Sequence, residues 1–390
     1  MKSIKKWFKN NKETFKFVSI AFVIWQIALM LIIFLANKYA PTSNQYLYTE
    51  KNLLSPVWLW NRANFDGMHY LSIAKNGYSL YQQAFFPLYP KLIHWLTPIF
   101  GSQGLVAGWT INLLSFYLAL FFLYKLLAMD FSLRIVKRAI VYLLLFPTAF
   151  FFSMVYTEAL FFLLIVLTFY MAKTHRWWLA GIFGALASAT RLPGIFLLAA
   201  LAVEWWCQYQ DKKKKIEKKK MINLLPSILL VSLGLLFYMR YLFVNYGDSL
   251  LFAHVQAYFA AGRETSKIIL LYQVFWRYFK MLITVDRGTL TYFVVVMEFL
   301  TAVSFSGIVI ATYFKRWYSY FIFSFLAFLA PTLTGTFLSL PRFVLVLFPA
   351  FILLSIWADK HRWLRIIYPL LTIPLLIFCL ILFVRGYWIS

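Results

Sequence analysis

Two side chains that can carry protons, Asp66 and His69, lie three residues apart in the polar stretch NFDGMHYLSIAKNGY, residues 64–78. The chain has only 13 acidic residues among 390, and this pair stands among aromatic residues. Burial and neighbouring charges can adjust the proton affinity of a shielded carboxylate, as a general base requires. Asp66 is therefore our candidate base. The alternative is a helix N-cap, because the helix-like run GMHYLSIAK follows it.

His69 also has two interpretations. Its imidazole could bind a phosphate or orient the base. Alternatively, it is an interfacial histidine that packs within a cluster of aromatic residues.

Glu158 stands at the start of an otherwise uncharged apolar run, FSMVYTEALFFLLIV. An ionised side chain facing lipid would cost about 2.5 to 3.5 kcal/mol or more, so Glu158 needs a partner. Arg191, in SATRLPG, is the expected one, either as a structural ion pair or as part of a binding site. Arg342, in LPRF, has a similar position, and guanidinium groups match phosphate in a bidentate fork.

The composition shows which scaffold must position these residues. The hydrophobic fraction is 63%, charged residues make up 13%, and the mean hydropathy is +0.74, which excludes a water-soluble globular class. Apolar runs long enough to cross a bilayer recur without residue-by-residue alternation, so we predict an all-α polytopic membrane protein with a single domain, 1–390. About eleven spans are expected, near residues 17–36, 103–127, 139–152, 156–172, 177–190, 194–206, 222–243, 289–312, 318–338, 343–357 and 366–385.

The basic residues predict the orientation. With the N-terminus in the cytoplasm, the inner segments carry 23 of the 38 Lys and Arg and the outer segments carry 12, as the positive-inside rule requires. The net charge of +25 thus reflects topology and contact with anionic membrane lipids, including the run DKKKKIEKKK at 211–220, and nucleic acid is not an expected partner. Cys207 and Cys379 are expected to be inert thiols.

Two long outer loops are predicted, at residues 37–100 and 244–288. The first contains the candidate base and is rich in Trp, Tyr and Leu, which is typical of helices lying at the membrane interface. Its stretch FFPLYPKLIHWLTPIF, residues 85–100, is broken by prolines and is expected to form a short interfacial helix. The second loop brings Asp248, His254 and Gln256 to the same outer face as Asp66.

Several motifs are missing from the sequence. No Asp-x-Asp pair, Walker A loop, Rossmann glycine pattern or His-Glu-x-x-His occurs, so metal-dependent use of nucleotide sugars, ATP-driven transport and zinc proteolysis lose support. We expect no metal and no cofactor. Metal-free chemistry on a phosphate leaving group needs cationic side chains instead, and the outer face supplies them.

FDGMHYLSIAKNGY followed by AFFPLYP resembles the signature of the PIG-V family of mannosyltransferases, which act in GPI-anchor assembly, and of its prokaryotic relatives. The likeness continues, in the same order, in YTEALF, ATRLPG, GDSLLFAHVQ and LPRFVLVLFP. Phe65 stands where the family often has Trp. The family belongs to the GT-C glycosyltransferases, multispan helical enzymes that take a sugar from a polyprenyl-phosphate carrier.

The resemblance implies an inverting, metal-independent transfer, with Asp66 as catalytic base at the outer face of the cell membrane. The donor would be a polyprenyl-phosphate sugar, with mannose as the expected sugar, and the acceptor a lipid or a glycan. Substrate-binding roles are expected for His69, Tyr70, Glu158, Arg191, His254, Gln256 and Arg342. The alternatives are a transporter or flippase for lipid-linked or anionic substrates, whose ionisable residues would lie near the bilayer midplane, and a noncatalytic assembly subunit.

Overall fold

The computed structural model describes residues 11–43, 56–210, 222–259, 263–264 and 267–389. Within these ranges all regular secondary structure is helical and no strand occurs, which confirms the expected all-α class. The basic run 211–220 and most of the basic N-terminal flank lie outside the described residues.

Among the described residues, six helices are long and apolar enough to cross a membrane, or seven if the bent pair Leu340–Val346 and Phe348–Lys360 forms one broken span. The pair is bent by 82°. The six are α2 (Lys12–Tyr39), α6 (Gly104–Leu127), η5 with α10 (Leu192–Phe196 and Leu197–Gln210), α12 with α13 (Leu225–Leu229 and Val231–Tyr246), α17 (Leu290–Phe314) and α21 (Arg362–Val384).

Shorter helices complete the bundle: α7 (Leu133–Leu144), α8 (Glu158–Lys173), α9 (Trp177–Ser188), α16 (Leu271–Thr284), α18 (Tyr318–Thr332) and α20 (Phe348–Lys360). The expected count of eleven spans stays unconfirmed. The span expected over residues 139–152 is wrong in its bounds, because α7 ends at Leu144 and is followed by a turn and the 3-10 helix η4 (Ala149–Ser153). Pro147 explains the break, since the residue before a proline is driven out of helical geometry.

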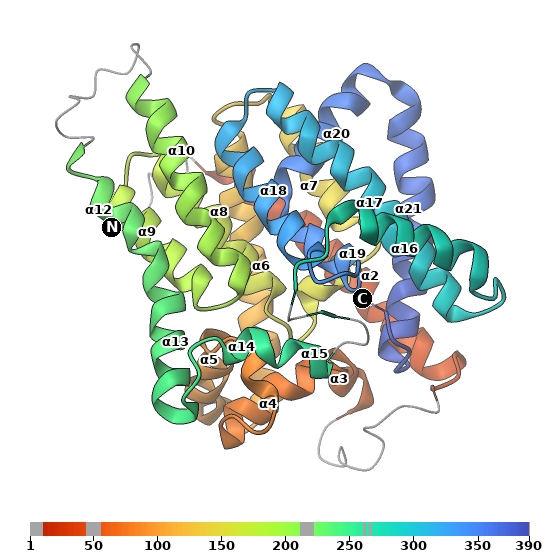
Figure 1. Cartoon of the computed structure of the whole chain (residues 1–390). Helices are drawn as coiled ribbons and strands as arrows, with labels where there is room; N and C mark the ends of the chain where they lie inside the picture. Colours follow the sequence, from red (N-terminus) through yellow and green to blue (C-terminus); the bar gives the residue numbers. More distant parts are fainter. Residues whose placement is uncertain (1–10, 44–55, 211–221, 260–262, 265–266, 390) are drawn as a thin grey trace.

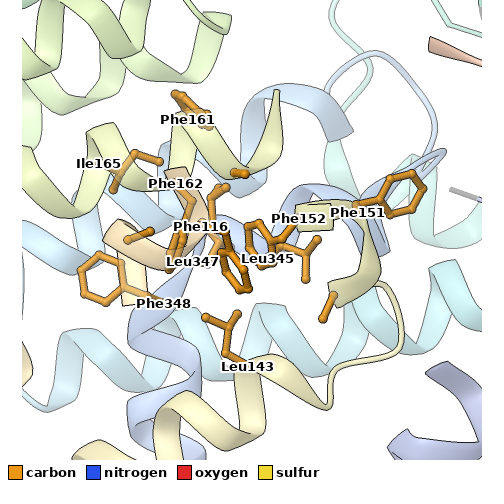
Figure 2. Close-up of a cluster of buried hydrophobic side chains, with 14 of the residues drawn as sticks. Phe116, Leu143, Phe151, Phe152, Phe161, Phe162, Ile165, Leu345, Leu347 and Phe348 are labelled. Carbon is orange, nitrogen blue, oxygen red and sulfur yellow. The ribbon is translucent and has the colours of Figure 1, made fainter. Parts of the chain in front are cut away.

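The centre of the bundle is α8, whose side chains are buried on all sides, as expected for a helix that is apolar all round. It packs mainly against α6 and α9. Figure 2 shows this buried cluster, in which the ring of Phe162 of α8 lies 5.2 Å from that of Phe152 of η4. Phe116 of α6 stacks on Phe152 with ring centroids 4.3 Å apart.

The outer helix α2 has two different faces. Trp25, Leu29 and Ile33 are buried in the protein, whereas Ile24 and Phe34 are exposed. A helix that leaves large apolar side chains uncovered along its length is suited to contact with lipid tails. The chain is therefore a membrane protein.

One end of the bundle carries a layer of short helices (bottom of Figure 1). They come from the two segments expected to form long loops. From residues 56–100 come α3 (Val57–Trp60), η1 (Asn61–Ala63), α4 (Asp66–Asn76), η2 (Gln82–Ala84), α5 (Leu88–Leu96) and η3 (Thr97–Phe100), and from the second segment come α14 (Leu251–His254) and α15 (Gln256–Phe259). The stretch 85–100 thus contains the expected short helix, α5. Elsewhere in the chain, two further short helices, α19 (Leu340–Phe343) and η6 (Val344–Val346), precede α20.

Candidate active site

The backbone turns sharply at Phe65, immediately before α4. Phe65 has φ 58° and ψ −116°, a conformation that costs a bulky residue on the order of 1–3 kcal/mol. Its ring packs against Phe383, at 5.8 Å between centroids, and against Trp388, at 5.0 Å. The side chain of Asn64 also donates a hydrogen bond to the carbonyl of Phe383 at 2.8 Å. These contacts hold the strained turn and thereby fix where Asp66 begins the helix.

Asp66 is the first residue of α4, and its carboxylate pairs with a distant cation. Arg342 Nη1 donates to Asp66 Oδ2 at 2.8 Å. The helix N-cap position belongs to Phe65, so the alternative reading of Asp66 as a simple N-cap is wrong. The side chain of Asp66 is 22% exposed and that of Arg342 is 9% exposed, which leaves the carboxylate partly open to an incoming group.

Arg342 lies on α19, in the break before α20. Its guanidinium carbon is 5.4 Å from the ring centroid of Phe151, 5.3 Å from that of Tyr156 and 5.3 Å from that of Phe343. Aromatic faces attract a desolvated cation. The rings therefore hold the guanidinium in place without neutralising its charge.

Glu158 joins two arginines. As expected from the sequence, Arg191 Nη1 binds Glu158 Oε1, at 2.5 Å, and the same oxygen lies 3.4 Å from Arg342 Nε. The Glu158 side chain is only 1% exposed and begins α8, where the helix dipole favours a negative charge. Its other oxygen, Oε2, has no hydrogen-bond partner in the part of the chain that the structure describes. Asp66, Arg342, Glu158 and Arg191 form one continuous charge cluster.

A third arginine, Arg263, was not identified from the sequence. It donates to Gln256 Oε1 at 2.7 Å and lies 6.0 Å from the ring centroid of Phe343, the ring that Arg191 and Arg342 also face. Burial lowers the pKa of Arg263, and the nearby Arg342 lowers it further while Asp66 raises it. Gln256 thus contacts Arg263, and Arg263 in turn lies beside the Phe343 ring that Arg191 and Arg342 of the charge cluster face. The only sequence signal was an arginine seven residues after that glutamine.

His69 and Tyr70 lie on α4 beside the base. The His69 ring stacks on Phe85 with centroids 4.9 Å apart, and its Nδ1 lies 3.4 Å from Gln82 Nε2. Burial lowers the pKa of His69, although Asp66 partly offsets this, so the imidazole is neutral at pH 7. Tyr70 is buried, and its hydroxyl lies 3.4 Å from the hydroxyl of Thr157, the residue before Glu158.

His254 does not join the charge cluster. Its side chain is 57% exposed, and its Nδ1 lies 2.6 Å from Asp248 Oδ2. This hydrogen bond lowers the pKa of Asp248. The pair closes the exposed turn before α14, since Asp248 also accepts from the backbone N–H of Leu250.

Arg62 is a further buried cation that the sequence did not reveal. Its guanidinium faces the ring of Trp109 at 4.6 Å and donates to the backbone and side-chain oxygens of Ser153. Burial lowers its pKa to about 9. Because Arg62 lies four residues before Asp66 and its carbonyl accepts from the backbone N–H of Val155, it ties the site's first segment to the chain before α8.

The charge cluster is suited to binding an anion. The cluster itself holds two guanidinium groups and two carboxylates, and Arg263 beside Phe343 adds a third guanidinium, which gives a balance of +1. A phosphate could bind two guanidiniums at once. Among the described residues, no group of three or more His, Cys, Asp or Glu side chains is arranged to hold a metal ion.

No protein-family model matches the chain, and no curated protein sequence matches it. The solved structures similar to it include oligosaccharyltransferases from Archaeoglobus fulgidus. One, tethered with an acceptor peptide containing the NVT sequon, has 14% identity and a TM-score of 0.44, over 98% of this chain and 56% of that one. The archaeal oligosaccharyltransferase AglB in complex with an inhibitory peptide and a dolichol-phosphate gives the same values.

The apo form of the Archaeoglobus fulgidus enzyme has 14% identity and a TM-score of 0.43, over 94% of this chain and 56% of that one. This chain therefore spans little more than half the length of the structures that it resembles. The likeness is low in both sequence and structure.

Proposed function

We propose that this chain is a membrane-embedded glycosyltransferase that moves a sugar from a lipid-linked phosphate donor to an acceptor hydroxyl. The proposal rests mainly on the contact between Asp66, a partly exposed carboxylate, and Arg342. The guanidinium of Arg342 also lies close to Glu158. A base beside a cationic anion site is what transfer from a sugar phosphate needs.

The reaction can be written from these residues. The acceptor oxygen attacks the anomeric carbon while Asp66 takes the hydroxyl proton, and the bond from that carbon to the phosphate oxygen breaks with its electron pair. The lipid phosphate leaves with an additional negative charge. Arg342 and Arg191 stabilise that charge, and Arg263, which also lies near the Phe343 ring, assists them.

The Asp66–Arg342 pair suggests how donor binding prepares the base. In the structure, Arg342 occupies one oxygen of the Asp66 carboxylate. A phosphate is a bidentate partner for guanidinium, so it competes for Arg342 and releases the carboxylate toward the acceptor. Glu158, with one oxygen already between two arginines, keeps both guanidiniums in place during this exchange.

The finer form of the proposal follows the resemblance to the PIG-V family. The fold is of GT-C type, the donor is polyprenyl-phosphate-mannose, and the acceptor is a lipid or a glycan. The transfer inverts the anomeric carbon, needs no metal, and takes place at the outer face of the cell membrane. The basic residues of the inner segments support this orientation.

The test is sugar transfer by the purified full chain. Synthetic polyprenyl-phosphate-mannose is supplied with a membrane lipid extract as acceptor, with and without a chelator, and the unmodified chain is compared with Asp66→Asn. Transfer that persists in chelator and falls by about 10²- to 10⁴-fold in the variant is expected for loss of a general base.

Asp248→Asn is the matched control, because Asp248 lies outside the charge cluster and pairs with His254; it should transfer normally. Equal transfer by Asp66→Asn and the unmodified chain would show that Asp66 is not the base. Absence of transfer, with the donor bound equally by both, would instead favour another donor sugar or the transporter interpretation.

A further inference from the structure

A polar cavity lies at the far end of α8 from the charge cluster. Its volume is about 380 Å³, within the range of small-molecule sites. Glu158 begins α8 and Lys173, which lines the cavity, ends it. At about 1.5 Å per residue, the two sites are separated by about 22 Å along the helix.

The cavity lies where apolar helices end. α6 ends at Leu127, α17 ends at Phe314 and α18 begins at Tyr318, and the cavity is lined by residues just beyond these ends, including Asp130 and Trp317. Helices that cross a bilayer end at the level of the lipid headgroups. Trp317 packs edge-on against Phe131 at 5.3 Å, and aromatic residues are enriched at this level.

The inner wall of the cavity presents hydrogen-bond acceptors. Glu204 is 8% exposed; it accepts from Ser319 Oγ at 2.6 Å and from Gln208 Nε2 at 2.8 Å. Gln208 is 5% exposed, and its Oε1 has no hydrogen-bond partner in the described part of the chain. A buried carboxylate next to an unused amide oxygen suits a ligand that brings a positively charged N–H donor.

The more exposed part of the cavity contains cationic side chains. Lys173 pairs with Asp130 there, while Arg316, on the exposed turn before α18, brings a second cation. The lining thus holds two acids and two bases. Lys173 interacts electrostatically with Glu204 as well as pairing with Asp130, while Arg316 is a second cation on the exposed turn. This arrangement fits a zwitterion whose ammonium enters first and whose phosphate stays at the surface.

We propose that this cavity binds the headgroup of an aminophospholipid. The primary ammonium donates to Glu204 and to Gln208 Oε1, and the phosphate meets Arg316, while the acyl chains remain in the bilayer beside α17 and α18. The site is independent of sugar transfer, because none of its lining residues belongs to the charge cluster.

The experiment measures lipid binding to the purified full chain in detergent by native mass spectrometry. Phosphatidylethanolamine, phosphatidylcholine and phosphatidylglycerol are titrated separately. Phosphatidylethanolamine should bind at least tenfold more tightly than the other two, because only it offers a primary ammonium, and Glu204→Gln should abolish this preference. Equal binding of the three lipids would overturn the proposal.

A second variant keeps the test decisive if Glu204→Gln fails to fold. Arg316→Gln changes an exposed turn and should weaken phosphatidylethanolamine binding about tenfold. Lys315→Gln, at the exposed neighbouring residue that does not line the cavity, is the matched control and should bind normally. Equal weakening by both changes would indicate general surface charge and contradict the assigned site. Free phosphoethanolamine binding as tightly as the lipid would overturn a lipid as the source of the ligand.

Discussion

The guanidinium of Arg342 donates a hydrogen bond to the carboxylate of Asp66 at 2.8 Å, across 276 residues of sequence. The same guanidinium lies 3.4 Å from Glu158. One side chain therefore bridges the proposed base and the residue that holds Arg191. Changes in Arg342 should disturb proton transfer and phosphate binding together.

Arg342→Lys tests this bridge. A lysine keeps the charge but lacks the planar fork that reaches two carboxylates, so transfer should fall by at least tenfold, and kcat should fall more than KM rises. Steady-state transfer kinetics measure this. Arg365→Lys is the control, because Arg365 is 40% exposed and pairs with an exposed acid; its kinetics should be normal. A rise in KM alone would show that Arg342 serves only donor binding.

Variants of Glu158 and Arg191 distinguish a structural role of this ion pair from a role in sugar transfer. Either Glu158→Gln or Arg191→Gln alone leaves a shielded charge without its partner and should lower the melting temperature. The double variant removes both charges and should recover part of that loss, while transfer stays low because Arg191 no longer meets the phosphate. Thermal melting and transfer are measured on the same samples. Recovery of transfer in the double variant would make the pair purely structural.

His69 should make stability depend on pH. Its pKa is lowered in the folded protein, so below about pH 6.5 the unfolded chain binds the proton more readily than the folded chain does. The contribution is full above that pH and is lost as the pH falls toward the lowered pKa. Melting temperatures of the unmodified chain should therefore drop over this interval more steeply than those of His69→Gln. Parallel curves would show that His69 does not cause the drop.

Arg263→Gln tests the arginine that the sequence did not reveal. Removing this cation should raise the KM for the donor about tenfold with a smaller change in kcat, because in the proposed mechanism Arg263 assists in binding the donor phosphate. Arg287→Gln, at an exposed arginine farther along the same segment, should leave KM unchanged. Donor titrations at fixed acceptor measure both. Equal KM values for the two variants would place Arg263 outside the donor site.

The parts of the site that could be predicted from the sequence are those marked by an exceptional residue in an apolar setting. Glu158 is an acid at the start of an apolar helix, so its need for a cation was evident, and Arg191 is that cation. Asp66 stood out because acids are rare in this chain. The all-α membrane class followed from the composition in the same way.

Other features depend on tertiary structure and could not be predicted. The pairing of Asp66 with Arg342 depends on how α19 folds back onto α4, which no local periodicity encodes. The sequence around Arg263 contains nothing exceptional, and only its contacts in the folded protein, with Gln256 and the Phe343 ring, distinguish it. His254 was expected at the same outer face as Asp66, and its partner in the structure, Asp248, could not be deduced from the sequence. The break after α7, in contrast, was already marked by Pro147.

The contacts of Phe65 and Asn64 with α21 and Trp388 also bear on how the protein is made. The strained turn before Asp66 is held by Phe383 and Trp388, and 319 residues separate Asn64 from its partner. During synthesis the chain is inserted into the membrane from its N-terminus. The turn at Phe65 is therefore made long before Phe383 and Trp388, the residues that hold it. The newly made protein should therefore remain inactive until α21 has been inserted, because only then is its proposed catalytic carboxylate fixed.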